Sequence, residues 1–132
     1  MAIERIDDKA YADAITEVWD SALTSTWQYP PVWVHGDIAT GNLLLQDGAL
    51  SAVIDFGQLG IGDPACDLAI AWTLFEGESR DVFRAELQLD RATWARGCGW
   101  ALWKALCSAF PGTDRIDWRV IDEIIKDHNC NK

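Results

Sequence analysis

The sequence predicts an α+β fold that is mainly α-helical and forms one domain over residues 1–132. Along most of the chain apolar residues recur every three or four positions, which is the period of a helix face. Short β-branched and leucine-rich segments, two of them joined by an Asp-Gly turn, predict a small β-hairpin in the first half. A length of 132 residues with 49% hydrophobic and 24% charged residues is typical of a globular domain with a real core.

The N-terminal part is expected to form a helix followed by a strand. Tyr11 and Ile15 belong to an apolar stripe that predicts a helix over residues 8–23. Pro30-Pro31 marks a stop after this helix. Residues 32–34, Val-Trp-Val, predict a short strand because β-branched and aromatic side chains favour extended backbone.

A hairpin and a capped helix are expected next. Residues 43–45 and 50–56 read as two strands around a turn at residues 46–48, where the glycine tolerates a positive φ. The glycine-rich stretch 57–62 has the wrong order for a phosphate-binding loop, so we expect a turn there. Asp63-Pro64 then begins a helix, because Asp can cap free N–H groups and Pro fits the first turn.

The rest of the chain is expected to be helical. Ser79 is predicted to cap a helix that ends near Leu89, and Asp90 to cap a longer one over residues 91–109. A break at Pro111-Gly112 separates these helices from a last helix. The tail from Asp127 onward is not expected to belong to that last helix. The eight tryptophans mostly fall on apolar stripes and are expected in the core. The apolar residues of the last helix are Ile116, Val120, Ile121, Ile124 and Ile125.

Acidic residues dominate the first part of the chain. The formal net charge is −10, and residues 10–79 hold ten Asp or Glu and no Lys or Arg. Such a chain would be repelled by nucleic-acid phosphates and by an anionic membrane surface, so neither is an expected partner. Glycine and apolar residues flank these acids, which favours a cation-binding site over an ordinary solvated face.

The cysteines do not form a metal-binding pattern. None of the four lies in a C-x-x-C pair, and neither histidine stands beside them, which disfavours zinc. We expect a cytoplasmic protein with reduced thiols, in which Cys66 and Cys107 are small buried residues. The N-terminus has no apolar signal region, and the longest apolar stretch, residues 68–75, is too short to span a bilayer.

Three oxygen-bearing side chains stand at predicted strand ends. Asp37 follows a strand and a glycine, Asn42 lies five residues later, and Asp55 ends the second hairpin strand. Oxygen side chains from adjacent strand ends can converge on one point, which suits magnesium with its retained waters. A carboxylate near such a metal can accept the proton of a hydroxyl that attacks phosphorus. The pattern therefore predicts phosphoryl transfer.

Three motifs, in order, resemble the aminoglycoside phosphotransferase family, relatives of protein kinases that phosphorylate small-molecule hydroxyls. They are HGDIATGN at residues 35–42, IDFGQLG at residues 54–60 and GDPACDLA at residues 62–69. Asp37 and Asn42 also have the separation of the protein-kinase motif H-R-D-L-x-x-x-N, with Gly36 in place of Arg. The resemblance covers most of residues 32–106. It implies the helical C-terminal lobe of a protein-kinase-like fold, with catalytic and metal-binding loops on the hairpin.

The resemblance implies a role for each matching residue. Asp37 would be the general base, or would at least orient the acceptor hydroxyl, and Asn42 and Asp55 would bind Mg²⁺. His35 would brace the catalytic loop rather than transfer protons. Asp67 would accept hydrogen bonds from the loop backbone and hold it. For each of these residues the alternative is an ordinary turn or cap residue.

The chain departs from the family before the first motif. Family members have a nucleotide-binding N-terminal lobe with a phosphate-binding Lys, whereas only 34 residues precede His35 and they hold no Gly-rich loop. We therefore expect a truncated C-terminal lobe, which is either a cloned fragment of a longer protein or the product of a truncated gene. We predict no ATP-binding residue within it. ATP is expected to bind only together with the missing lobe, and that lobe would also hold the cations that the acidic segment lacks.

Two hypotheses about function follow. The first is the catalytic and acceptor-binding lobe of a small-molecule kinase, inactive alone, whose acceptor is an aminoglycoside-like cation or another metabolite. The second is a non-catalytic remnant with a binding or oligomerisation role. Surface left by the missing lobe is expected to cause homodimerisation. The candidate residues for that surface are Trp27, Tyr29, Trp33, Tyr11 and Ile15.

Overall fold

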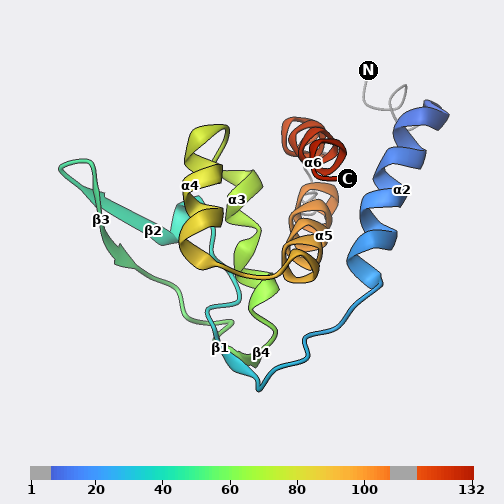
Figure 1. The fold of residues 1–132 in the computed structure, drawn as a ribbon. Helices are drawn as coiled ribbons and strands as arrows, with labels where there is room; N and C mark the ends of the chain where they lie inside the picture. The colour runs from blue at the N-terminus through green and yellow to red at the C-terminus, as the bar shows by residue number, and fades with distance from the viewer. Residues whose placement is uncertain (1–6, 108–115) are drawn as a thin grey trace.

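A computed structural model describes residues 7–107 and 116–132. In these residues helices pack around α5, one small antiparallel sheet projects at the left of Figure 1, and a second lies at the bottom. The mainly helical α+β fold is thus confirmed. The helices are α2 (Lys9–Leu23), α3 (Ile70–Thr73), α4 (Glu78–Leu87), α5 (Arg91–Cys107) and α6 (Trp118–Cys130), with the 3-10 helices η1 (Thr40–Asn42) and η2 (Pro64–Leu68). The strands are β1 (Val32–Val34), β2 (Leu43–Gln46), β3 (Ala49–Val53) and β4 (Gly60–Gly62).

The core surrounds α5, which packs against α2, η2 and α6. Its largest fully buried side chains include Trp72, Leu102, Ile121 and Ile124. Two glycines allow the close approach of α5: a Cβ on Gly99 would lie 2.5 Å from Cβ of Ala22, and one on Gly97 would lie 2.8 Å from Cβ of Leu68. Helix α5 is therefore the scaffold on which η2 and the loops before it are placed.

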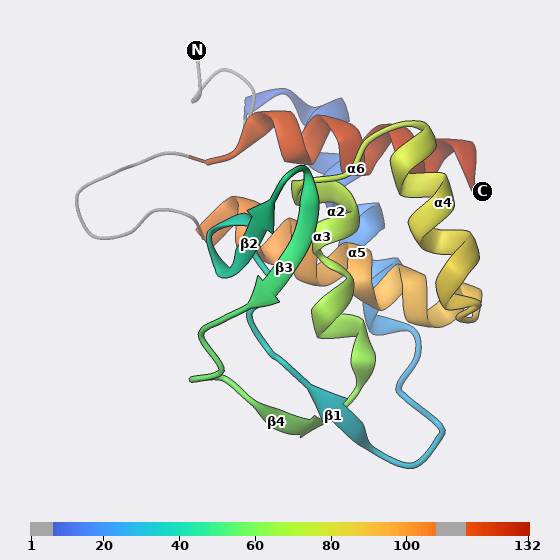
Figure 2. The same cartoon turned by 90° about the vertical axis from the view of Figure 1, so that its left-hand side faces the viewer.

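The two sheets are separate: in Figure 2 the β2–β3 hairpin lies in front of the helices and the β1–β4 pair lies at the bottom. β2 and β3 form the expected hairpin, in register from Leu43 opposite Val53, with an irregularity between Leu44 and Leu45. The turn expected over residues 57–62 is confirmed at residues 57–58, but residues 60–62 instead form β4, which pairs with β1. Strand propensity could not indicate a Gly-Ile-Gly strand, because tertiary pairing with β1 creates it.

Aspartates cap helices at several positions, and the caps at Asp63 and Asp90 were predicted from the sequence. Asp8 accepts from the N–H of Ala10, and Asp63 from that of Ala65, both at 3.0 Å. Asp90 accepts from the N–H of Thr93 at 2.7 Å, ahead of α5. Free N–H groups at a helix start are satisfied in this way, which is why these aspartates mark the helix boundaries.

Some helix boundaries were predicted wrongly. Ser79 does not cap α4, because its Oγ bonds the backbone of Glu76 and the helix begins after Gly77 and ends at Leu87. The helix after Asp63-Pro64 begins as 3-10 turns and stops at Thr73. The tail does continue the last helix to Cys130. The expected end at residue 109 and the break at residues 111–112 lie outside the described residues.

Several burial predictions also need correction. Cys98 is the buried cysteine, while Cys66 is half-buried and Cys107 is exposed. Trp72 and Trp94 are core residues, but other tryptophans are well exposed, Trp33 at 72%. Tyr11 and Ile15, which were expected on an association surface, are partly buried and pack against the core. Within the described ranges, no helix has the length and apolar character needed to cross a membrane.

Candidate active site

The loop after β1 is held by Asp67 on η2. Oδ2 of Asp67 accepts from the backbone N–H of His35 at 2.8 Å, and Oδ1 accepts from that of Gly36 at 2.9 Å. A carboxylate that receives two backbone N–H groups binds more strongly than a neutral acceptor would. Because η2 packs directly on α5, the position of the loop is tied to the core.

His35 joins this loop to the end of the hairpin. Its Nε2 lies 2.9 Å from the carbonyl oxygen of Ile54, and its Nδ1 accepts from the backbone N–H of Asp37 at 3.1 Å. These contacts fit the neutral ring with the proton on Nε2. The ring centroid also lies 4.7 Å from that of Phe56. Backbone groups therefore occupy both ring nitrogens, and neither is left to transfer a proton.

Gly36 is required by the shape of the loop. Its φ is +87°, and a Cβ at this position would lie 2.4 Å from the carbonyl oxygen of Gln58. Any other L-residue would meet both backbone strain and a clash with main chain that cannot move independently. The Gly in the motif thus lets the segment after β3 lie against the loop.

Both oxygens of the Asp37 carboxylate have partners. Nδ2 of Asn42 donates to Oδ2 at 3.2 Å and to the backbone carbonyl of Asp37 at 2.8 Å. Nζ of Lys104, on α5, lies 3.6 Å from Oδ1. Asp37 is 43% exposed, so its carboxylate is fixed in direction while still open to solvent.

Asp55 stands two residues after the end of β3, next to the last backbone pairing of the hairpin with Asn42. The N–H of Ile54 donates to the carbonyl of Asn42 at 2.9 Å, which extends the ladder one step beyond the Leu43–Val53 pair. Asp55 follows directly, exposed and with φ +60°, and its Oδ1 accepts from the N–H of Gly57 at 3.4 Å. A non-glycine residue in the left-handed region costs free energy and is common at functional sites.

Comparison with known proteins identifies the family. A model of the Phosphotransferase enzyme family (APH) matches residues 2–100. The chain belongs to this family. The chain is 35% identical over 68 residues to the aminoglycoside 3'-phosphotransferases of Escherichia coli and Salmonella typhimurium, matches that cover 50% of the chain and 25% of each relative.

Two solved structures are also similar to this chain. One is a ternary complex of streptomycin, ATP and APH(2'')-IIa, with a TM-score of 0.49 and 21% identity over 97% of this chain and 43% of that one. The other is ADP-bound APH(2'')-Ib, with a TM-score of 0.48 and 18% identity over 94% and 48%. The chain thus spans a quarter of the curated relatives that it matches and less than half of these structures.

Asn42 and Asp55 would supply only part of the ligand shell of a magnesium ion. In residues 7–107 and 116–132, no group of three or more His, Cys, Asp or Glu could hold a metal ion. Asn42 and Asp55 offer an amide oxygen and a carboxylate, both hard donors. Mg²⁺ commonly takes one or two carboxylates and completes its shell with water and substrate phosphates, so this donor set suits it.

The cations of this site were not predicted from the sequence. Arg96 pairs with Asp63 at 2.7 Å and Lys104 with Asp37 at 3.6 Å, and both cations come from α5. Two of the acidic residues therefore have counter-ions, although we expected those cations only in a missing lobe. The sequence feature that could have indicated these cations is the eight-residue spacing of Arg96 and Lys104, which places both side chains on one helix face.

A thiol lies beside this acidic cluster but is not a nucleophile. Burial raises the pKa of Cys66 to about 11, and the negative charges of Asp67 and Asp63 contribute to the increase. The thiolate is the reactive form of cysteine, and a thiol with this pKa is almost fully protonated at neutral pH. Covalent catalysis through Cys66 is therefore disfavoured, and Asp37 is the better candidate for the reacting group.

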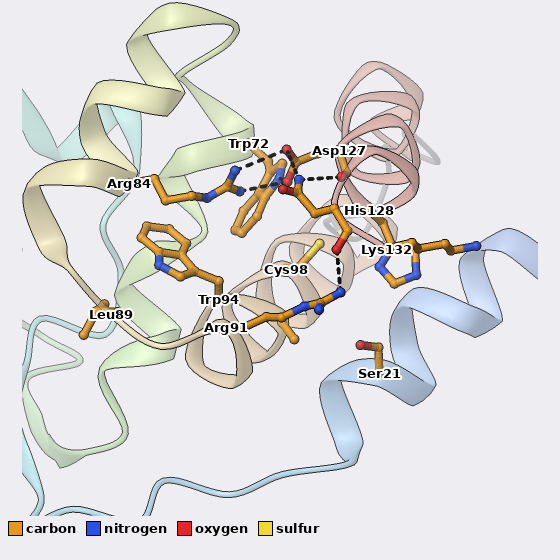
Figure 3. A pocket seen from close by; sticks show the side chains of 12 residues that line it. Ser21, Trp72, Arg84, Leu89, Arg91, Trp94, Cys98, Asp127, His128 and Lys132 are labelled. Carbon is orange, nitrogen blue, oxygen red and sulfur yellow. Dashed lines mark hydrogen bonds and ion pairs between the residues drawn. The ribbon is translucent and has the colours of Figure 1, made fainter.

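A separate pocket lies between α2, α4, α5 and α6 (Figure 3). It has a volume of about 430 Å³, and none of its lining residues lies between residues 22 and 71. The Arg84–Asp127 ion pair and the hydrogen bond from Arg91 to the carbonyl of Asn131 form part of its wall. The cationic groups at this pocket are thus used within the protein, and no predicted site residue reaches it.

Proposed function

We propose that this chain carries the hydroxyl-activating part of an ATP-dependent phosphotransferase that acts on a small-molecule hydroxyl. The observation that carries the proposal is the Asp37 carboxylate, whose two oxygens contact Asn42 and Lys104 while the group stays open to solvent. A base must be oriented and within reach of the proton that it accepts. Membership of the phosphotransferase family supports the same reaction class.

In the proposed step, the acceptor oxygen forms a bond to the γ-phosphorus of ATP. The bond from that phosphorus to the β,γ-bridging oxygen breaks, ADP leaves, and the hydroxyl proton passes to the Asp37 carboxylate. Asn42 and Asp55 would hold Mg²⁺, which when bound would neutralise phosphate charge. His35 and Asp67 contribute by holding the loop, since both contact its backbone.

We propose that the groups contacting the ATP phosphates come from outside these residues. The segment 10–79 offers no Lys or Arg, and the two nearby α5 cations pair with Asp37 and Asp63. The acceptor is proposed to be cationic, because an acidic surface attracts and steers such ligands. The aminoglycoside 3'-phosphotransferase relatives agree with that class of acceptor.

A second candidate is a non-catalytic binding or oligomerisation domain. Exposed aromatic side chains near β1 favour it: Trp33 is 72% and Tyr29 61% exposed. Large exposed apolar groups close together are typical of association surfaces. In this case the chain would form a homodimer, and light scattering at tens of micromolar would give twice the mass of one chain.

The test of catalysis restores a nucleotide-binding lobe, in cis or in trans, and compares two variants. Asp37→Asn removes the base with little change in size, so the initial rate should fall about 10²–10⁴-fold. Asp55→Asn weakens the metal site, so its defect should ease as Mg²⁺ is raised. Asp20→Asn, the same change on the exposed face of α2, is the control.

Different responses to Mg²⁺ would support the assigned roles. The Asp37→Asn rate should stay low at every Mg²⁺ concentration, while the Asp55→Asn rate recovers in part. If both recover equally, Asp37 is a metal ligand rather than a base. A restored protein that transfers phosphate equally well with Asn at position 37 would refute the proposed function.

A further inference from the structure

Lys104 reaches the candidate site from a distant part of the sequence. It lies on α5, and its side chain is only 22% exposed, with the Nζ atom itself buried. An ammonium group taken out of water is costly unless an opposite charge compensates it. The carboxylate of Asp37, 3.6 Å from Nζ, supplies such a charge.

The two oxygens of Asp37 are divided between two partners. Lys104 contacts Oδ1, while Nδ2 of Asn42 donates to Oδ2. Without Lys104 only the Asn42 hydrogen bond would orient the carboxylate. Asn42 lies against the Asp37 carboxylate, and Asp55 follows Ile54, whose N–H donates to the Asn42 carbonyl. A freed carboxylate oxygen would then be a third hard donor next to these two residues.

We propose that Lys104 is a positioning residue that holds Asp37 by Oδ1 and so keeps it from becoming a ligand of the divalent cation. This inference rests on the proposed function, in which Asp37 is the base and Asn42 and Asp55 hold Mg²⁺. A base must keep a lone pair for the incoming proton, and metal coordination would use that lone pair. Lys104 acts on the reaction only through Asp37.

The test measures binding of Mn²⁺, a paramagnetic stand-in for Mg²⁺, to the full chain without nucleotide. Lys104→Met removes the charge but keeps an apolar stem of similar length, and Mn²⁺ affinity should rise about 5–10-fold. Lys104→Arg keeps a cation and should leave the affinity unchanged. Lys126→Met, the same substitution at an exposed position of α6, is the matched control.

A double-mutant cycle separates positioning from simple repulsion between Lys104 and the metal. In the Asp37→Asn background, Lys104→Met should change Mn²⁺ affinity less than about 2-fold, because the carboxylate that it frees is gone. An equal increase in both backgrounds would mean that Lys104 only repels the cation, and the proposal would fail.

A second readout follows Asn42 directly. The side-chain amide resonances of Asn42 should move in Lys104→Met and keep their positions in Lys104→Arg, because Asn42 donates to the carboxylate that Lys104 holds. Unchanged resonances together with a lowered melting temperature would show a merely structural role. If Lys104→Met does not fold, Lys104→Gln takes its place in every comparison.

These measurements need no phosphoryl transfer, so the two proposals can fail separately. A coupled Mn²⁺ response in a protein that stays inactive with a restored lobe would refute the proposed function and leave the positioning role. An active protein without coupling between Lys104 and Asp37 would refute the positioning role of Lys104 and leave the proposed function standing.

Discussion

The carboxylate of Asp67 accepts a 2.8 Å hydrogen bond from the backbone N–H of His35, 32 residues earlier in the chain. The same carboxylate accepts from the next N–H, that of Gly36, at 2.9 Å. One side chain on η2 thus satisfies two successive donors of the loop that carries Asp37. Removing it would leave both donors part-buried and without that acceptor, which is costly.

Asp67→Ala should therefore lower the free energy of unfolding by about 2–4 kcal/mol, the cost of two hydrogen bonds to a charged acceptor. Urea denaturation at pH 7 measures this loss. Asp20→Ala, an exposed aspartate on α2, provides the control and should change stability by less than about 0.5 kcal/mol. Equal stability of the two variants would show that the Asp67 contacts do not hold the loop.

Gly36→Ala should destabilise the fold by at least about 2 kcal/mol. The new Cβ would lie 2.4 Å from the carbonyl oxygen of Gln58 at a φ of +87°. Gly41→Ala is the matched control, because a Cβ there would meet nothing within 4 Å. Thermal melts of both variants check the expectation, which a normal melting temperature for Gly36→Ala would contradict.

Gly99→Ala should lower stability although Ala is the better helix former. In an ordinary helix interior the change would stabilise by about 0.5–1 kcal/mol, but here the new Cβ would lie 2.5 Å from Cβ of Ala22. Overpacking of this kind costs about 1–3 kcal/mol.

Moving the methyl group to the other helix provides the control. The double variant Ala22→Gly with Gly99→Ala should recover much of the loss, since it exchanges the two Cβ positions. Denaturant melts of the four proteins give the coupling energy, expected to exceed about 1 kcal/mol. Strict additivity would mean that α2 and α5 do not approach as closely as described.

Stability should fall at acid pH through Asp127. Burial acts to raise the pKa of this carboxyl, but hydrogen bonds from Arg84 and Trp72 and the charge of Arg84 hold the pKa below its ordinary value of 3.8. Because the folded-state pKa is the lower one, the stabilisation is complete above about pH 4 and is lost as the pH falls through the folded value.

Asp127→Asn should remove this contribution, lowering stability at pH 7 by about 1.5–3 kcal/mol. The difference between variant and parent should shrink as the pH falls from 5 to 2. Urea melts across that range measure it, with Asp20→Asn as the control. A difference that is the same at every pH would show that the Asp127 charge does not stabilise the fold.

Local chemistry is what the sequence could predict. Asp63 and Asp90 were predicted as helix starts, because a cap needs only its own neighbouring N–H groups. The hairpin turn at residues 46–48 was likewise indicated by a nearby glycine. By contrast, Ser79 was misassigned, because the same side chain can satisfy a turn just as well as a helix start.

The sequence by itself determined the family, the mainly helical fold class and the residues proposed to carry the chemistry. Motifs and apolar periods involve residues that are close together in the sequence, so they can be recognised without the structure. Only the tertiary structure decided that β4 pairs with β1 and that Arg96 and Lys104 supply the cations missing from residues 10–79. Lys104 is 67 positions from Asp37 in the sequence. Their contact depends on how α5 packs against η2 through Gly97, and no local pattern encodes that packing.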